Sequence, residues 1–262
     1  MIRFVQIGYR ETGRCPYSRF MTSHREPEGH PPHESPDHDP SAWLGGTAHG
    51  DEPATEKGAG DVATEARFSG TAFDVVGLLA SAGGLRAVSE IVGSLPPDFP
   101  AAILLVQHLD RRHRSLMADI LGRRSALPTR QAVDGDKLEP GTIYLAPPDY
   151  HLLANPDGSL SLSHSALVHF VRPSGDLLFE SLAGSYGSRV IAVVLTGSGF
   201  DGTMGVRAVK QMGGTVIVED PAEAEFPSMP KAAIDSGAVD FVLPLADIGP
   251  ALCRLVAEED VT

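Results

Sequence analysis

The sequence predicts an α/β fold: a doubly wound, mainly parallel, Rossmann-like sheet with an inserted β-hairpin, preceded by a disordered N-terminal tail. From residue 73 onward, short apolar runs of strand length alternate with stretches of helical period. Two short strands around a Pro-Asp-Gly turn interrupt this alternation. Strands that alternate with helices favour a parallel sheet covered on both faces.

The N-terminal segment, residues 1–70, is predicted to be a disordered low-complexity tail. Its runs REPEGHPPHESPDHDP and HGDEPATEKGAGD are crowded with proline, glycine and charged residues and sustain no apolar period. Its histidines match no compact metal-ligand spacing, so we expect no metal site there. Met21 is an alternative start of the chain.

The first half of the domain starts with two fully apolar strands, 75–79 and 101–107, joined by an amphipathic helix. A second stretch of helical period follows, and then two short strands. The Pro156-Asp157-Gly158 turn joins the strands of the hairpin. Besides these two strands, the elements predicted in this half are a helix at 85–95, a helix at 115–123, strands at 130–133 and 142–146, and hairpin strands at 150–155 and 159–163.

The second half opens with a helix for which Ser174 is a plausible N-cap. The most apolar strand, 189–195, leads into the glycine loop TGSGFDG at 196–202. Neither an internal repeat nor a linker interrupts the chain after residue 70, so we assign 71–258 to one catalytic-size domain. The other elements predicted here are helices at 174–186, 203–212, 230–236 and 246–257, and strands at 215–218 and 241–243.

Composition excludes several classes of protein. The net charge of −13 argues against a general nucleic-acid binder, because neutralising phosphates requires clustered Lys and Arg. The two cysteines, Cys15 and Cys253, are far apart in the sequence, so a disulfide framework is not expected. No apolar run is long enough to span a membrane, and residues 1–13 lack the apolar core of a signal peptide. We therefore expect a cytoplasmic protein that does not insert into the membrane.

Three residues of complementary chemistry follow apolar strands: Ser81, His108 and Asp201. Sites in open parallel sheets form at the carboxyl ends of strands, so these residues can meet there. Together they predict a triad in which His108 takes the Ser81 proton and Asp201 orients the imidazole. Taken singly, each has a plainer interpretation as a helix cap, a hydrogen-bonded histidine or a turn residue. Convergence at one edge of the sheet is what favours the triad.

The same glycine loop supports an alternative function. Gly197, Gly199 and Gly202 spell G-x-G-x-x-G between a strand and a helix, and Glu219 or Asp220 follows about 20 residues later, as in nicotinamide-dinucleotide-binding oxidoreductases. Against this, the Asp201 carboxylate would repel a pyrophosphate at that position. A third interpretation is that these glycines only make room for a tight loop.

Six ordered blocks of this sequence resemble the catalytic domain of the chemotaxis protein-glutamate methylesterases, the CheB family. The resemblance runs from about Phe73 to Val256. The blocks are VVGLLASAGGLRAV, LLVQHLDRRHRSLMADIL, VDGDKLEPGTIYLAPPDYHLLA, HFVRPSGDLLFESLA, VVLTGSGFDGTMGVRAVKQMGG and EDPAEAEFPSMPKAAI.

The resemblance implies a serine esterase with the triad on Ser81, His108 and Asp201. It implies hydrolysis of glutamate γ-methyl esters on helical chemoreceptor-type proteins, deamidation of glutamine in many members, and no metal or organic cofactor. The family pattern places an oxyanion donor at the backbone N–H of Ser198, and Ala82 is a second candidate.

The sequence also departs from the family pattern. Family members usually have Thr after the nucleophile, where this chain has Ala82, and Met-Gly-Asn before the aspartate, where it has Ser198-Gly199-Phe200. A backbone donor survives both changes. Members also usually carry an N-terminal receiver domain, and residues 1–70 lack the pattern of one. The expectations are therefore an esterase that works alone or with a separate receiver or regulatory protein, or a signalling module that is catalytically idle.

Overall fold

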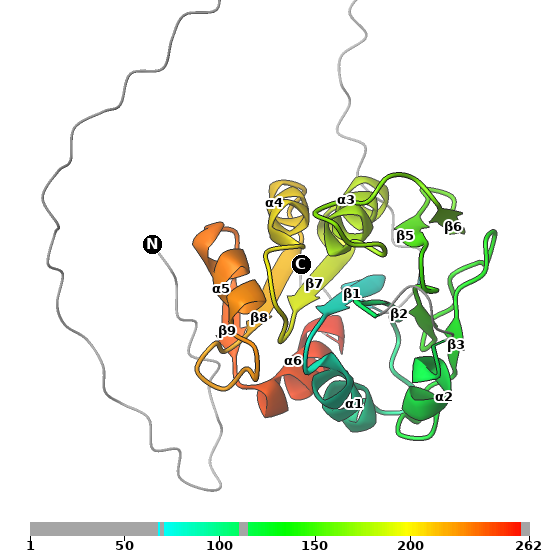
Figure 1. Cartoon of the computed structure of the whole chain (residues 1–262). Helices are drawn as coiled ribbons and strands as arrows, with labels where there is room; N and C mark the ends of the chain where they lie inside the picture. The colour runs from blue at the N-terminus through cyan, green and yellow to red at the C-terminus, as the bar shows by residue number, and fades with distance from the viewer. Residues whose placement is uncertain (1–67, 69–70, 110–114, 258–262) are drawn as a thin grey trace, which may run out of the picture. The chain divides into compact units, whose positions relative to one another are not determined.

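A seven-stranded parallel sheet forms the centre of the computed structural model of this chain (Figure 1). The structure describes residues 68, 71–109 and 115–257. The predicted tail over 1–70 therefore lies outside the described residues except for Phe68. Those described residues all belong to one compact unit; the domain limits of 71–258 stay a prediction.

The strands and helices follow each other in the predicted order. The strands of the large sheet are β1 (Val75–Ala80), β2 (Ala102–Gln107), β3 (Thr129–Gln131), β4 (Ile143–Leu145), β7 (Val190–Val194), β8 (Thr215–Glu219) and β9 (Phe241–Leu243). The hairpin consists of β5 (His151–Ala154) and β6 (Leu160–Ser163). The helices are α1 (Gly84–Ser94), α2 (Met117–Gly122), α3 (Gly175–Tyr186), α4 (Thr203–Gln211), α5 (Ser228–Asp235) and α6 (Leu245–Ala257), with a short 3₁₀ turn, η1 (Gly187–Arg189), before β7.

The strand order places β1, the first strand of the described residues, in the middle of the sheet. The sheet runs β3-β4-β2-β1-β7-β8-β9, and every neighbouring pair in it is parallel. Strands β2, β3 and β4 lie on one side of β1, and the next strand of the sheet, β7, lies on the other side of β1. This reversal between β1 and β7 is a topological switch point, where α/β folds usually place their sites.

Each face of the sheet is covered by its own set of helices. In β1, Val76 and Leu78 pack into one core with α1, α2 and α6, whereas Val75 and Leu79 pack into the other core with α3, α4 and α5. This alternation follows from the two-residue period of a strand. Figure 1 shows α3 and α4 on one side of the sheet and α1 and α6 on the other. The prediction of a doubly wound, Rossmann-like fold is confirmed.

The hairpin is also confirmed; β5 packs against α3, and β6 is hydrogen-bonded to the segment that follows edge strand β3. Its Leu152 and Leu160 are buried in the same core as α3. One sequence prediction needs correction. Ser174 does occupy the N-cap position of α3, but its side chain makes no capping hydrogen bond to the helix. Its hydroxyl is used elsewhere, as described below.

Candidate active site

The three residues predicted to form a triad come from three adjacent strands. Ser81 follows β1, His108 follows β2, and Asp201 lies in the loop after β7. Because β2, β1 and β7 are parallel neighbours, their carboxyl ends meet at one edge of the sheet. The strand registers pair Ala80 with Gln107, so Ser81 and His108 leave the sheet side by side.

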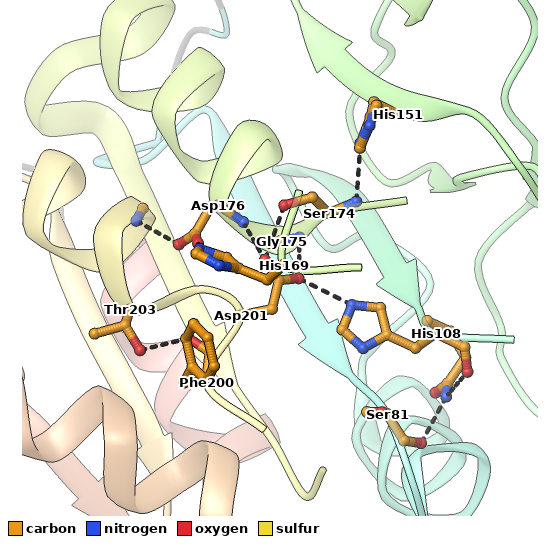
Figure 2. Close-up of polar contacts among 12 residues, drawn as sticks. Ser81, His108, His151, His169, Ser174, Gly175, Asp176, Phe200, Asp201 and Thr203 are labelled. Carbon is orange, nitrogen blue, oxygen red and sulfur yellow. Dashed lines mark hydrogen bonds and ion pairs between the residues drawn. The ribbon is translucent and has the colours of Figure 1, made fainter. Parts of the chain in front are cut away.

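His108 and Asp201 are directly paired. The Nε2 atom of His108 lies 2.9 Å from Oδ2 of Asp201, and the two side chains are only 12% and 4% exposed. The same carboxylate accepts hydrogen bonds from the backbone N–H groups of Gly175 (2.5 Å) and Asp176 (3.2 Å) and from the Ser174 hydroxyl (2.8 Å). Asp201 therefore caps the first turn of α3 from another part of the chain, which is the task the sequence assigned to Ser174 (Figure 2).

The surroundings of Asp201 favour its charged form. Burial alone would raise the pKa of this carboxyl, but the hydrogen bonds from His108, Gly175 and Ser174 outweigh burial and hold the pKa below its ordinary value. An ionised Asp201 accepts a hydrogen bond from the protonated Nε2 of His108. The other ring nitrogen, Nδ1, is then the proton acceptor of the imidazole.

Ser81 lies on the side of the imidazole opposite Asp201 (Figure 2). Its backbone N–H donates to the carbonyl of Thr196 (3.0 Å), and the Thr196 hydroxyl donates to the carbonyl of Ala82 (3.1 Å). The side chains of Ser81 and His108, both in the described part of the chain, form no hydrogen bond with each other. Such bonds are commonly long before substrate binds, so this spacing is compatible with proton transfer in a complex.

The loop after β7 lies against the serine. Gly197 approaches so closely that a Cβ there would lie 2.8 Å from the Cβ of Ser81. Only glycine permits this approach, and it brings the loop after β7 against the serine. The amides of Ala82 and Ser198, both predicted as oxyanion donors, have no backbone or side-chain acceptor among residues 71–109 and 115–257. They are available to an incoming oxygen atom.

Sequence reasoning missed a side chain that joins the serine and histidine loops. Gln107 is buried, and its Nε2 donates both to the carbonyl of Ser81 (2.6 Å) and to the carbonyl of His108 (3.1 Å). Its position as the last residue of a fully buried strand was the only available signal.

A second missed residue, His151, supports the start of α3. It is fully buried, its Nδ1 accepts the backbone N–H of Ser174 (3.1 Å), and its Nε2 donates to the carbonyl of Ala166 (3.1 Å). Burial lowers the pKa of this imidazole. The neutral form is the one that can accept the Ser174 amide, so burial and hydrogen bonding act together.

The arrangement argues against the dinucleotide alternative. Asp201 is paired with His108, and its carboxylate would repel a pyrophosphate at this loop. Glu219, one of the two residues that would contact a ribose, is fully buried, and its Oε2 accepts the backbone N–H of Thr196 (2.7 Å); the other, Asp220, is partly exposed. Burial raises the pKa of Glu219. The glycines instead serve close packing: a Cβ at Gly202 would lie 2.4 Å from Leu79.

A pocket of about 1050 Å³ opens beside Ser81 and His108. It continues from the serine along α1 and α2. No helix in the described part of the chain has both the length and the apolar character needed to cross a membrane.

The family model for the CheB methylesterase domain matches residues 76–252, which include Ser81, His108 and Asp201. In a comparison with solved structures, the chain resembles the Thermotoga maritima CheB methylesterase catalytic domain with a TM-score of 0.68 and 40% identity. The likeness covers 70% of this chain and 99% of that one.

Curated relatives differ in how much of their length this chain covers. A Moorella thermoacetica protein-glutamate methylesterase/protein-glutamine glutaminase is 40% identical over 78% of this chain and 49% of its own length. The Myxococcus xanthus protein-glutamate methylesterase FrzG is 38% identical over 70% of this chain and 55% of its own length. A Leptospira interrogans relative is 37% identical and is covered over 95% of its length. The chain thus spans about half of the two longer relatives.

Proposed function

Because the chain belongs to the CheB methylesterase family, we propose that it is a serine hydrolase that removes methyl groups from glutamate γ-methyl esters. Its substrates are methylated, helical, chemoreceptor-type proteins, and the products are methanol and a glutamate carboxylate. The observation that carries the proposal is the His108–Asp201 pair, 2.9 Å apart, beside Ser81 at the end of the central strand.

In the first half of the reaction, the Ser81 hydroxyl oxygen attacks the ester carbonyl carbon while Nδ1 of His108 takes the hydroxyl proton. The imidazolium that forms is stabilised by the ionised Asp201 at Nε2. Collapse of the tetrahedral intermediate breaks the bond to the methoxy group. His108 returns the proton to that oxygen, so methanol leaves and the glutamyl group stays on Ser81 as an ester.

In the second half, a water molecule replaces the alcohol. Nδ1 of His108 takes a proton from the water as the water oxygen attacks the acyl carbon, and the proton then passes to the Ser81 oxygen as it leaves. The enzyme is restored and the substrate keeps a carboxylate. The same steps with ammonia as the leaving group would deamidate a glutamine, which is a second proposed reaction of this site.

The negative charge of both tetrahedral intermediates falls on the former carbonyl oxygen. We assign its stabilisation to the backbone N–H groups of Ser198 and Ala82, which have no acceptor among the described residues. Backbone donors explain why Ala82 can stand where relatives usually have Thr. The proposed place of action is the cytoplasm, on receptor helices that extend into it.

The test is methanol release from receptor membranes whose glutamates carry a radiolabelled methyl ester. The wild-type protein should release labelled methanol, and Ser81→Ala should lose the activity by about 10³-fold or more while its thermal unfolding stays unchanged. Release by Ser81→Ala at the wild-type rate would contradict the assignment of the nucleophile. No release by the wild type would favour an idle module.

A further inference from the structure

A groove between α1 and α2 leads away from Ser81. It is the pocket of about 1050 Å³ that opens beside the proposed nucleophile. The two helices contact each other, and Figure 1 shows them side by side. The groove has two walls. The first wall consists of Leu85, Arg86 and Ser89 from α1, and the second consists of Leu116, Met117, Ile120 and Arg124 from α2 and its flanks.

The spacing of these residues explains why they share one groove. Leu85 and Ser89 are four residues apart on α1, and on the other wall Met117, Ile120 and Arg124 are separated by three and four residues. Residues three and four apart lie on one face of a helix. Leu85 and Leu116 leave 43% and 60% of their surface exposed at the mouth. An apolar groove between two helices is a shape that accepts the apolar face of a third.

The charges of the groove differ from those of the whole chain. The chain carries a net charge of −13 and would repel an acidic partner. Arg86 and Arg124 are nevertheless exposed along the groove, and neither forms an ion pair with a described residue. The positive charge of Arg86 acts against the burial that raises the pKa of Glu219. Two exposed cations that form no ion pair among the described residues are suited to bind carboxylates.

One acidic residue also lines the groove, and its position is informative. The side chain of Glu225 lies against Gly83, at the Ser81 end. A carboxylate there would disfavour an anion at the point of reaction and would accept a neutral ester. The cation at the far end is Arg124, whose carbonyl lies beside Gly93 near the end of α1. Gly93 is seven residues beyond Arg86, which corresponds to about 10 Å along the helix.

We infer that this groove binds the substrate helix that carries the ester, and that Arg86 and Arg124 bind carboxylates at other positions of the same helix. The inference rests on the proposed function. It assigns substrate preference to charge: a helix whose neighbouring residues are glutamates binds better than one in which they are neutral. Each demethylated site becomes such a carboxylate, so the preference would grow as a receptor with several sites is demethylated.

The probes that test this are two synthetic helical peptides of about 20 residues, long enough to be helical in water. Each carries one glutamate γ-methyl ester. At the positions four and seven residues from the ester on both sides, one peptide has glutamate and the other has glutamine. Wild-type kcat/KM should be about fivefold higher for the glutamate-flanked peptide, since each exposed ion pair contributes about 0.5 kcal/mol. High salt should remove the difference.

The variants are Arg86→Glu, Arg124→Glu and the double variant. The double variant should lose the preference, and the loss should come from a higher KM for the glutamate-flanked peptide. Arg123→Glu is the matched control: Arg123 is exposed, adjacent to Arg124, and does not line the groove. It makes the same charge change and should keep the preference.

The outcomes separate this inference from the proposed function. If the wild type hydrolyses both peptides with equal kcat/KM, or if Arg123→Glu lowers the preference as much as the groove variants do, the groove does not select by charge and the inference is wrong. The esterase assignment would then stand. If the wild type releases methanol neither from these peptides nor from methylated receptors, the proposed function fails and the inference fails with it.

Discussion

A single buried amide holds the proposed nucleophile and base together. Gln107 donates to the carbonyls of Ser81 and His108 from one side-chain nitrogen. It is packed so tightly that a Cβ on Gly84 would lie 2.1 Å from its Oε1. Gln107 therefore fixes the loop that carries Ser81 relative to the loop that carries His108. Small displacements of reacting groups lower the reaction rate strongly.

Replacing Gln107 with methionine keeps its length and removes both donors. We expect kcat to fall by about 10- to 100-fold with little change in KM, because the reacting groups lose their alignment while the groove stays intact. Relative to wild type at the same pH, Gln107→Glu should lose least activity at low pH, where a protonated carboxyl can still donate one hydrogen bond, and should lose more as the carboxyl ionises.

The control for both variants is Ser89→Ala, which alters another buried polar residue of the same pocket. Its hydroxyl donates only to the carbonyl of Leu85 within α1. The measurement is the rate of methanol release by wild type and the three variants at several pH values. Wild-type kcat in Gln107→Met, or an equal loss in Ser89→Ala, would show that the amide does not position the reacting groups.

At the scale of an element, the start of α3 and the glycine loop depend on each other. Asp201 caps α3 through the amides of Gly175 and Asp176, and α3 in turn supplies donors that keep Asp201 ionised. A Cβ at Gly175 would lie 2.3 Å from Leu79, so the first turn of α3 sits directly on the central strand. The carboxylate is thus both a structural cap and the proposed partner of the base.

Asp201→Asn should therefore reduce both activity and stability. The amide NH₂ would face donors, so we expect methanol release to fall by about 10³- to 10⁴-fold and the free energy of unfolding by about 2 kcal/mol. The folded-state pKa of Asp201 is lowered, so its stabilising effect is complete above its ordinary value of 3.8 and is lost as pH falls through the folded pKa.

Urea unfolding of wild type and Asp201→Asn at several pH values measures this effect. The stability difference should be constant between about pH 5 and pH 7 and should shrink below about pH 4. A difference that grows on acidification would have the wrong sign for a depressed carboxyl pKa. Ser174→Ala is a graded control, because it removes one of the four donors and leaves the others in place.

The element scale also shows what sequence could and could not predict. The helices and strands follow from apolar periodicity, and their limits differ from the predicted ones by one or two residues at most ends. Ser174 was assigned to α3 as a cap because a serine before a helix usually has that role. A carboxylate 27 residues away displaced it. A cap supplied by a residue far along the chain cannot be recognised from the local sequence pattern. The same is true of the buried His151.

At the scale of the whole molecule, the meeting of Ser81, His108 and Asp201 was predictable because parallel strands end at one edge. The apolar runs predict where the strands end, and neighbouring parallel strands bring their carboxyl ends together at one edge of the sheet. The support around the site was not predictable. Gln107, the Thr196 hydroxyl and the open groove between α1 and α2 depend on how the loops pack after the sheet has formed.

The central claim is that an activated Ser81 hydroxyl performs the chemistry, and its reaction with a fluorophosphonate tests this most directly. Peptide mapping by mass spectrometry should find the adduct on Ser81 of the folded protein, with labelling in His108→Gln slower by about 10²-fold or more because the base is lost. An unlabelled Ser81, or equal labelling rates in wild type and His108→Gln, would contradict the account.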